Sequence, residues 1–216
     1  MSVTVKLYYS PGSCSMGPHI ALEEAGVAYE PVPVVLAKGE NHTPEYRAIH
    51  ARGLVPVLQT EGQSLTEAVA ILLHIARRWP DAGLLPQAGS LTEVRTLELL
   101  LWLTNTLHVA YACLWRPARF TKDTAAGEVI QGEAKERIAA FNDDIEKRFA
   151  DGRPFAVGDV YTLADAFLIV FFRWANIIGL DTAGRYPHWT AWAKRMEVRP
   201  AVARVLTQEG VSLWGR

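Results

Sequence analysis

The first eighty residues alternate between strand-like and helix-like segments, and this alternation constrains the fold more than any other feature. Short apolar runs rich in valine, leucine and tyrosine are typical of strands, whereas apolar residues spaced by three and four are typical of helices. The turn pair Glu61-Gly62 predicts a hairpin, and Thr66 is the expected N-cap of the helix that follows. The expected strands are 3–9, 29–36, 54–59 and 63–65, and the expected helices are 19–26, a short one from Thr43, and 67–79.

The resulting order, βαβαββα, is the pattern of a thioredoxin-like domain. A Pro/Gly-rich stretch follows it and is typical of a linker. Beyond this stretch no segment resembles a strand, so the rest of the chain is expected to be all-α. We therefore expect a thioredoxin-like α/β domain at residues 1–80, a linker at 81–90 and an all-α helical domain at 91–216.

Two helices of the second part are marked clearly. A long helix is expected from Ser90 to about Trp115. Another begins at Thr162, whose side chain can cap the backbone of Asp165 while Asp165 caps Thr162 in return. The run after this capping box, 167–172, is apolar on nearly every side, so it predicts a helix buried in the core.

Composition excludes several functional classes. Half of the 216 residues are apolar, 21% are charged and the formal net charge is −1, so no basic excess points to nucleic acid. The N-terminus lacks the apolar core of a signal peptide, and no uninterrupted apolar run has membrane-spanning length. Two cysteines in a chain of this size suit a reducing compartment, and the cytoplasm is the expected location. The histidines lack metal-ligand spacing, so no metal site is expected.

The turn between the first strand and the first helix, residues 10–19, is the first candidate site. Cys14 lies near the expected positive end of the helix, where unpaired N–H groups attract anions and favour a thiolate. No lysine follows to complete a phosphate-binding loop, and no second cysteine forms a dithiol motif. The residues leave two interpretations open: a reactive or ligand-contacting thiol, and a small buried side chain.

The long helix carries polar and aromatic residues at helical spacing. Leu101, Asn105, His108, Tyr111 and Trp115 are separated by four, three, three and four positions, which predicts one face. The mixture of amide, imidazole, phenol and indole is typical of a pocket wall. A histidine satisfied within the core is the alternative for His108, which otherwise could donate or accept a proton near neutral pH.

Three further positions could bind a ligand. Pro56 interrupts a strand, which a cis Val55–Pro56 bond or an edge position would explain, and the backbone of Val55 could then pair with an extended peptide. The start of the helix at Glu67 and Ala68 could hold a carboxylate and an amine, although a simple capped helix explains the same residues. Lys38 is a candidate partner for a carboxylate.

Taken together, these residues resemble the glutathione S-transferase family, and most closely its bacterial beta class. The resemblance extends over the full chain. Its most specific parts are the first and last of four motifs: Tyr8-Tyr9-Ser10-Pro11-Gly12-Ser13-Cys14-Ser15 with Pro18-His19, Gly53 to Leu58, Leu65 to Ile71, and Thr162-Leu163-Ala164-Asp165-Ala166.

The resemblance implies a thioredoxin-like domain that binds glutathione as co-substrate, a helical domain that binds an electrophile, and a homodimer. It implies that Cys14 contacts the glutathione sulfur and can form a mixed disulfide with it. Leu101 and Thr106 depart from the class, which carries polar or acidic residues there. Positions that match the tripeptide site are Lys38, Val55 before Pro56, Glu67 and Ala68, with Asn105, Thr106 and His108 added by the long helix.

The expected activity is conjugation of the glutathione thiolate to small hydrophobic electrophiles. Cys14 and His108 are the expected catalytic residues, and the hydroxyl and N–H groups around Ser13 are expected to stabilise the thiolate. Two alternatives remain. Cys14 could itself be the nucleophile of a thiol transferase or peroxidase, or the chain could be a binding or regulatory protein of the same fold. The expected electrophile pocket consists of Tyr111, Trp115 and Trp174.

Overall fold

The computed structural model describes residues 5–215, whose N-terminal part contains a four-stranded mixed sheet. Strand β1 is parallel to β2 and antiparallel to β3, and β3 pairs antiparallel with β4. The spatial order is β2-β1-β3-β4, so the predicted βαβαββα thioredoxin-like pattern is confirmed. The strands are β1 (Lys6–Tyr9), β2 (Glu30–Pro33), β3 (Val57–Thr60) and β4 (Gln63–Leu65).

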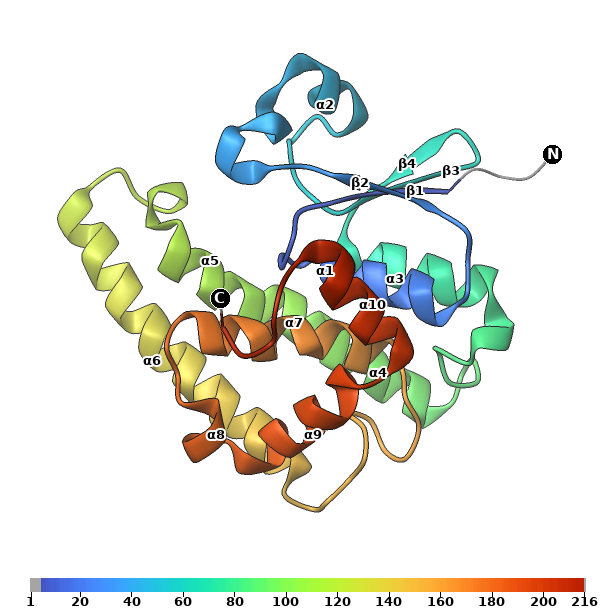
Figure 1. The fold of residues 1–216 in the computed structure, drawn as a ribbon. Coiled ribbons are helices and arrows are strands. Elements are labelled where there is room, and N and C mark those ends of the chain that lie inside the picture. Colours follow the sequence, from blue (N-terminus) through green and yellow to red (C-terminus); the bar gives the residue numbers. More distant parts are fainter. Residues whose placement is uncertain (1–4, 216) are drawn as a thin grey trace.

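Helices cover both faces of this sheet (Figure 1). Helices α1 (Met16–Glu24) and α3 (Ala68–Arg78) lie on one face, and α2 (Pro44–Ile49) lies on the other. Side chains alternate accordingly along β1: Leu7 packs into the main core, whereas Tyr8 packs into a small cluster beneath α2.

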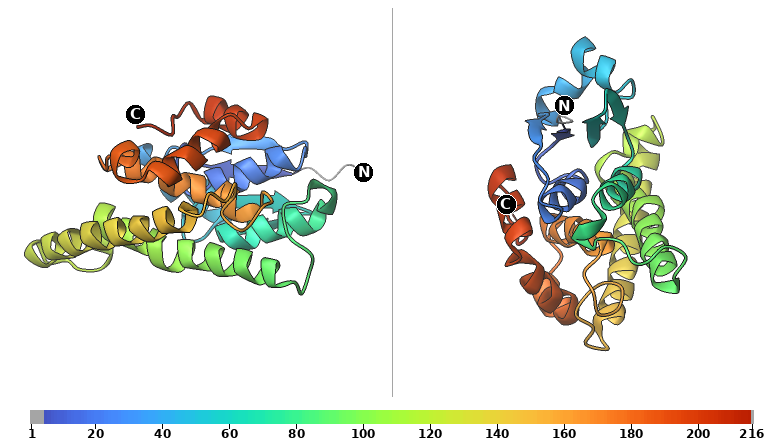
Figure 2. Two further views of the ribbon diagram at one scale, coloured as in Figure 1. Left: turned by 90° about the horizontal axis from the view of Figure 1, so that it is seen from below. Right: turned by 90° about the vertical axis from the view of Figure 1, so that its right-hand side faces the viewer.

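The remaining chain is helical and stacks beneath the sheet-bearing part (Figure 2). This arrangement confirms the predicted fold class, an α/β part followed by an all-α part. The helices are α4 (Leu91–Trp102), a π-helical segment (Leu103–Leu107), α5 (His108–Trp115), α6 (Thr124–Phe149), α7 (Leu163–Ile177), α8 (Thr182–Arg185), α9 (Pro187–Glu197) and α10 (Pro200–Glu209), and short 3-10 turns lie at Leu36–Lys38, Glu40–His42, Pro80–Ala82 and Pro117–Arg119.

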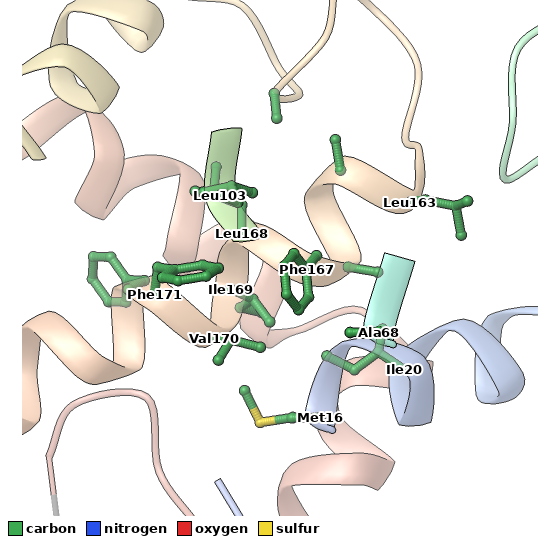
Figure 3. Packing of buried hydrophobic residues seen from close by; sticks show 14 of the residues in the cluster. Met16, Ile20, Ala68, Leu103, Leu163, Phe167, Leu168, Ile169, Val170 and Phe171 are labelled. Carbon is green, nitrogen blue, oxygen red and sulfur yellow. The ribbon is translucent and has the colours of Figure 1, made fainter. Parts of the chain in front are cut away.

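Helix α7 is the centre of the core, as its apolar sequence predicts. Figure 3 shows Phe167 of α7 among Met16 and Ile20 of α1 and Ala68 of α3. One continuous hydrophobic cluster therefore joins the sheet-bearing and helical parts. Leu84 lies inside the expected linker, and its side chain is buried in the same cluster. The expected boundaries, with a domain at 1–80, a linker at 81–90 and a domain at 91–216, therefore remain a prediction.

The continuous helix Leu91–Trp115 is long and apolar enough to cross a membrane, judged by length and composition alone, and no other helix in residues 5–215 is. In this fold α4 packs against α7, and α5 packs against α6. The buried face of the helix Leu91–Trp115 therefore belongs to the core of the helical part.

Two predicted helix starts were wrong. Helix α1 begins at Met16, three residues before the expected start. Helix α3 begins at Ala68, and its N-cap is Glu67 without a side-chain cap, so Thr66 does not have the capping role that its type suggests. The reason is the backbone of Glu67, whose φ of 68° interrupts the helical path between Thr66 and Ala68.

The predicted capping box at the start of α7 is present, and Asp165 has further partners. Its carboxylate accepts hydrogen bonds from the Thr162 N–H at 3.0 Å, the Ala156 N–H at 2.7 Å and the Trp192 indole N–H at 3.0 Å. The residue is 1% exposed, so water cannot replace these bonds. Asp165 thus ties three segments together at the start of the core helix.

We expect Asp165→Ala to lower the free energy of unfolding by about 3–5 kcal/mol, because it leaves several buried donors unpaired. Urea titration followed by circular dichroism measures this change. The control is Asp144→Ala, which removes an exposed carboxylate paired with Lys147 on α6 and should cost about 0.5 kcal/mol or less. Equal effects of the two substitutions would contradict the assigned role of Asp165.

Candidate active site

The turn between β1 and α1 forms one end of a large cavity. Ser15 fixes its shape, because its hydroxyl accepts the Ser10 N–H at 3.0 Å and donates to the Ser10 carbonyl at 3.2 Å. Ser13 and Cys14 lie in this turn and line the cavity, which has a volume of about 810 Å³. Cys14 is half-buried in the cavity wall and packs partly against the core, so it is not enclosed in the core as a purely structural side chain would be.

Residues far along the chain hold this turn at Gly12. Its N–H donates to the Glu209 carboxylate at 2.6 Å, and its carbonyl accepts the Trp174 indole N–H at 2.9 Å. The Arg173 guanidinium donates to the same carbonyl at 3.3 Å, and the other Glu209 oxygen lies 2.8 Å from Nδ1 of His19. A Cβ at residue 12 would lie 2.5 Å from the Arg173 guanidinium, which would have to move, and the φ of 66° also favours glycine at this position.

A second wall is the loop before β3. The predicted cis peptide bond between Val55 and Pro56 is present. Two side chains hold the preceding backbone: the Tyr46 hydroxyl donates to the Leu54 carbonyl at 2.7 Å, and the Asn41 amide donates to the Gly53 carbonyl at 2.8 Å. The Cys14 thiol donates to the carbonyl of Val55 across a distance of 3.6 Å. The loop and the cysteine turn therefore face each other directly.

The start of α3 completes the N-terminal half of the site. Ala68 is the first residue of the helix, and both it and Glu67 line the cavity. Glu67 has a left-handed backbone, uncommon for a residue with a side chain and frequent at ligand sites. Its carboxylate is exposed and pairs with Arg52 at 2.8 Å.

The opposite wall comes from the helical part and is mainly aromatic. The ring of Tyr111 lies 5.0 Å from that of Trp115 and 5.2 Å from that of Trp174, and His108 lies 5.3 Å from Trp174. Burial, followed by the charges of Arg116 and Arg119, lowers the pKa of His108. The imidazole is therefore neutral at pH 7, able to accept a proton or a hydrogen bond.

The predicted stripe on the long helix is wrong at one position. Leu101 does not line the cavity and is 49% exposed on the outer surface, whereas Thr104 does line it. The π-helical segment Leu103–Leu107 is the cause, because its wider turn changes the phase between α4 and α5. Spacing rules for a regular helix cannot anticipate this change.

The cavity gathers most of the predicted site residues and omits two. Lys38 and Thr106 do not line it, and their roles remain predictions. Thr104, Arg116, Arg119 and Arg173 are among the lining residues that sequence reasoning missed. Arg173 had a detectable signal, since it is a lone cation in an otherwise apolar run. The predicted residues that line the cavity are Ser13, Cys14, Val55, Pro56, Glu67, Ala68, Asn105, His108, Tyr111, Trp115 and Trp174.

Within residues 5–215, no three histidine, cysteine, aspartate or glutamate side chains lie close enough together to hold a metal ion.

The environment of Cys14 counts against the expected thiolate in the ligand-free protein. Burial raises the pKa of its thiol to about 11. Backbone N–H groups of the turn and the charge of Arg116 act in the opposite direction, but their combined effect is smaller. At neutral pH the thiol is therefore protonated and suited to donating a hydrogen bond, as it does to Val55.

We expect iodoacetamide to alkylate Cys14 slowly at pH 8, about 100-fold more slowly than a free cysteine, because thiolate is the reactive form. The rate should rise with pH until the thiol ionises near pH 11. Mass spectrometry of a Cys113→Ser variant isolates the reaction at Cys14. A midpoint at or below the ordinary value for cysteine, about 8.5, would contradict the effect of burial.

Two family models match the chain and together span most of it. The model described as "Glutathione S-transferase, N-terminal domain" matches residues 3–77, and "Glutathione S-transferase, C-terminal domain" matches residues 63–195. The second match alone covers more than half of the chain.

Individual relatives agree with these models. Glutathione S-transferase GstA of Escherichia coli O157:H7 is 32% identical over 211 residues, which cover 96% of this chain and all of that protein. A glutathione transferase homologue from Sulfitobacter, solved with bound glutathione, superposes with a TM-score of 0.90 at 35% identity over 98% of this chain and all of that one. A beta-class glutathione S-transferase from Sphingomonas chungbukensis gives 0.84 at 32% identity over 96% of this chain and all of that one. With its sheet, its helical part and its cysteine turn, the chain belongs to the glutathione S-transferase family, as its resemblance to the bacterial beta class predicts.

Proposed function

We propose that this enzyme binds glutathione in the cavity and transfers its thiolate to a small electrophile. The observation that carries this proposal is that one cavity brings the Cys14 turn, Val55 and Glu67–Ala68 together with His108 and the aromatic wall. The first group suits a peptide thiol with a charged end, and the second suits an apolar partner. The homologue from Sulfitobacter, which binds glutathione, supports the first half of this assignment.

In the proposed reaction the glutathione thiol loses its proton and its sulfur forms a carbon–sulfur bond with the electrophile. The leaving group departs with the electron pair of the bond that breaks, and the proton passes to solvent. The thiolate is stabilised by the Cys14 thiol, which can donate to it, by the start of α1 and by the positive charge of Arg116. Neutral His108 can accept the proton or orient a water that does.

Chemistry at Cys14 itself is the alternative within enzymes, and its raised pKa disfavours it. A thiol with a pKa of about 11 is a poor nucleophile at neutral pH, because only the thiolate attacks a disulfide. The further alternative, a binding or regulatory protein, is disfavoured because the expected ligand positions Val55, Glu67 and Ala68 line an open cavity.

We expect the wild-type protein to bind glutathione in calorimetry and to conjugate it to a chlorinated dinitrobenzene. Cys14→Ala should retain this conjugation within about tenfold, because the thiol contributes only one hydrogen bond to the sulfur. Disulfide reduction that depends on Cys14 should be slow in the wild type, because the thiol is protonated, and absent from the variant. Cys113→Ala is the control. Absence of both binding and conjugation in the wild type would contradict the proposed function.

We also propose a homodimer formed through the exposed face of α4. Leu91, Val94 and Leu101 lie on this face at spacings of three and seven and are 70%, 52% and 49% exposed. Arg95 and Glu98 lie between them and form an ion pair. Apolar side chains in such a row are typical of a covered surface.

We expect Leu101→Glu to convert the dimer to a monomer, because it places a charge in the apolar face. Sedimentation velocity measures the change. Val129→Glu is the matched control, since Val129 is 65% exposed on α6, outside this face. A wild-type monomer, or a dimer that survives Leu101→Glu unchanged, would contradict the proposed interface.

The proposed setting is removal of reactive electrophiles in the cytoplasm. Both cysteines, Cys14 and Cys113, are free thiols in the structure, which suits a reducing compartment.

A further inference from the structure

The cavity carries an excess of positive charge on the side of the helical part. Three arginines line it, Arg116, Arg119 and Arg173. The only carboxylate among its described lining residues is Glu67, and that carboxylate pairs with Arg52. Arg173 donates to the Gly12 carbonyl, which leaves Arg116 and Arg119 as the two cations not engaged in holding the site together.

Arg116 and Arg119 lie next to each other without a counter-ion among residues 5–215. Arg116 is the C-cap of α5, and Arg119 ends the 3-10 turn that follows it. Neither guanidinium forms an ion pair or a side-chain hydrogen bond with another described residue. The pKa of Arg119 is lowered, first by burial and then by the charge of Arg116. Two like charges held at one cavity wall favour binding of an anion between them.

The position of this pair within the cavity identifies which ligand it faces. Both arginines line the cavity with Cys14 and His108, and the charge of Arg116 acts on both of these groups, whereas that of Arg119 acts on His108. The rings of Tyr111, Trp115 and Trp174 line the same cavity as the two arginines. The expected contacts of the glutathione backbone, Val55 and Glu67–Ala68, belong to the other wall. The pair therefore faces the second substrate.

We propose that the second substrate is an electrophile with an aromatic or conjugated body and a carboxylate, which Arg116 and Arg119 bind. This inference rests on the proposed function and specifies its substrate class. A planar body packs against the indole and phenol rings, and guanidinium groups bind a carboxylate through paired hydrogen bonds. When the carboxylate is bound in this way, the reactive carbon of the substrate lies between the aromatic wall and the Cys14 turn, where the glutathione sulfur is expected.

The test compares a fluoronitrobenzoate with the corresponding fluoronitrobenzamide, which has the same ring and no charge. In each reaction the glutathione sulfur forms a bond to the ring carbon, fluoride leaves with the bonding electron pair, and the thiol proton passes to buffer. Dividing each kcat/KM by the uncatalysed rate constant removes the difference in intrinsic reactivity. We expect the wild-type enzyme to prefer the benzoate, and added salt to reduce this preference.

The doubly substituted variant Arg116→Gln/Arg119→Gln should lower the benzoate-to-benzamide ratio by roughly tenfold or more, mainly through KM for the benzoate. Loss of the Arg116 charge should also slow both conjugations through the glutathione thiolate, and the ratio cancels this common effect. The control is Arg77→Gln, which removes an exposed guanidinium on α3 that does not line the cavity. It should leave the ratio and both rates unchanged.

Three outcomes would overturn the inference, and they differ in what else they overturn. An unchanged ratio in the double variant overturns the inference alone, because conjugation itself continues. A rise in KM for glutathione with an unchanged ratio assigns the pair to the tripeptide and also overturns the inference alone. Absence of glutathione binding and of both conjugations in the wild type overturns the proposed function together with the inference.

Discussion

The hydrogen bonds at Gly12 are the interaction on which the site depends. Glu209 and Trp174, from α10 and α7, bind the N–H and the carbonyl of one residue in the β1–α1 turn. Both bonds are buried, so water does not compete with them in the folded protein, and removing either side chain would leave a buried group on Gly12 without that partner. The position of Cys14, two residues later, is thus set by residues more than 150 positions away in the chain.

The shared hydrophobic core holds the groups that form these hydrogen bonds in a fixed arrangement. Helix α7 is buried on almost all sides and packs against both α1 and α3, so the two walls of the cavity are parts of one rigid body of side chains. A cavity between such walls can hold a peptide thiol on one side and an electrophile on the other. This arrangement suits the proposed reaction, which joins two separately bound molecules.

Burial and nearby charges set the protonation states of Cys14 and His108 in the cavity. Cys14 is protonated because burial raises its pKa, and His108 is neutral because burial and two arginines lower its pKa. The same arginines supply positive charge where a thiolate is proposed to form. These groups are a protonated thiol, a neutral imidazole and nearby cations. They are better suited to stabilising a thiolate that belongs to the ligand than to providing a nucleophile from the protein itself.

The sequence by itself determined the order of elements, the capping box at Thr162 and Asp165 and the buried α7, and most of the site residues predicted from it line the cavity. These features depend on local patterns: periodicity, turn residues and side-chain caps. Only the tertiary structure decided which residues meet. The π-helical segment moved Leu101 out of the cavity, the backbone of Glu67 displaced the expected cap at Thr66, and burial reversed the expected ionisation of Cys14. The pairing of Gly12 with Glu209 and the gathering of Arg116 and Arg119 at the cavity likewise arise from contacts between distant segments, and no local pattern encodes such contacts.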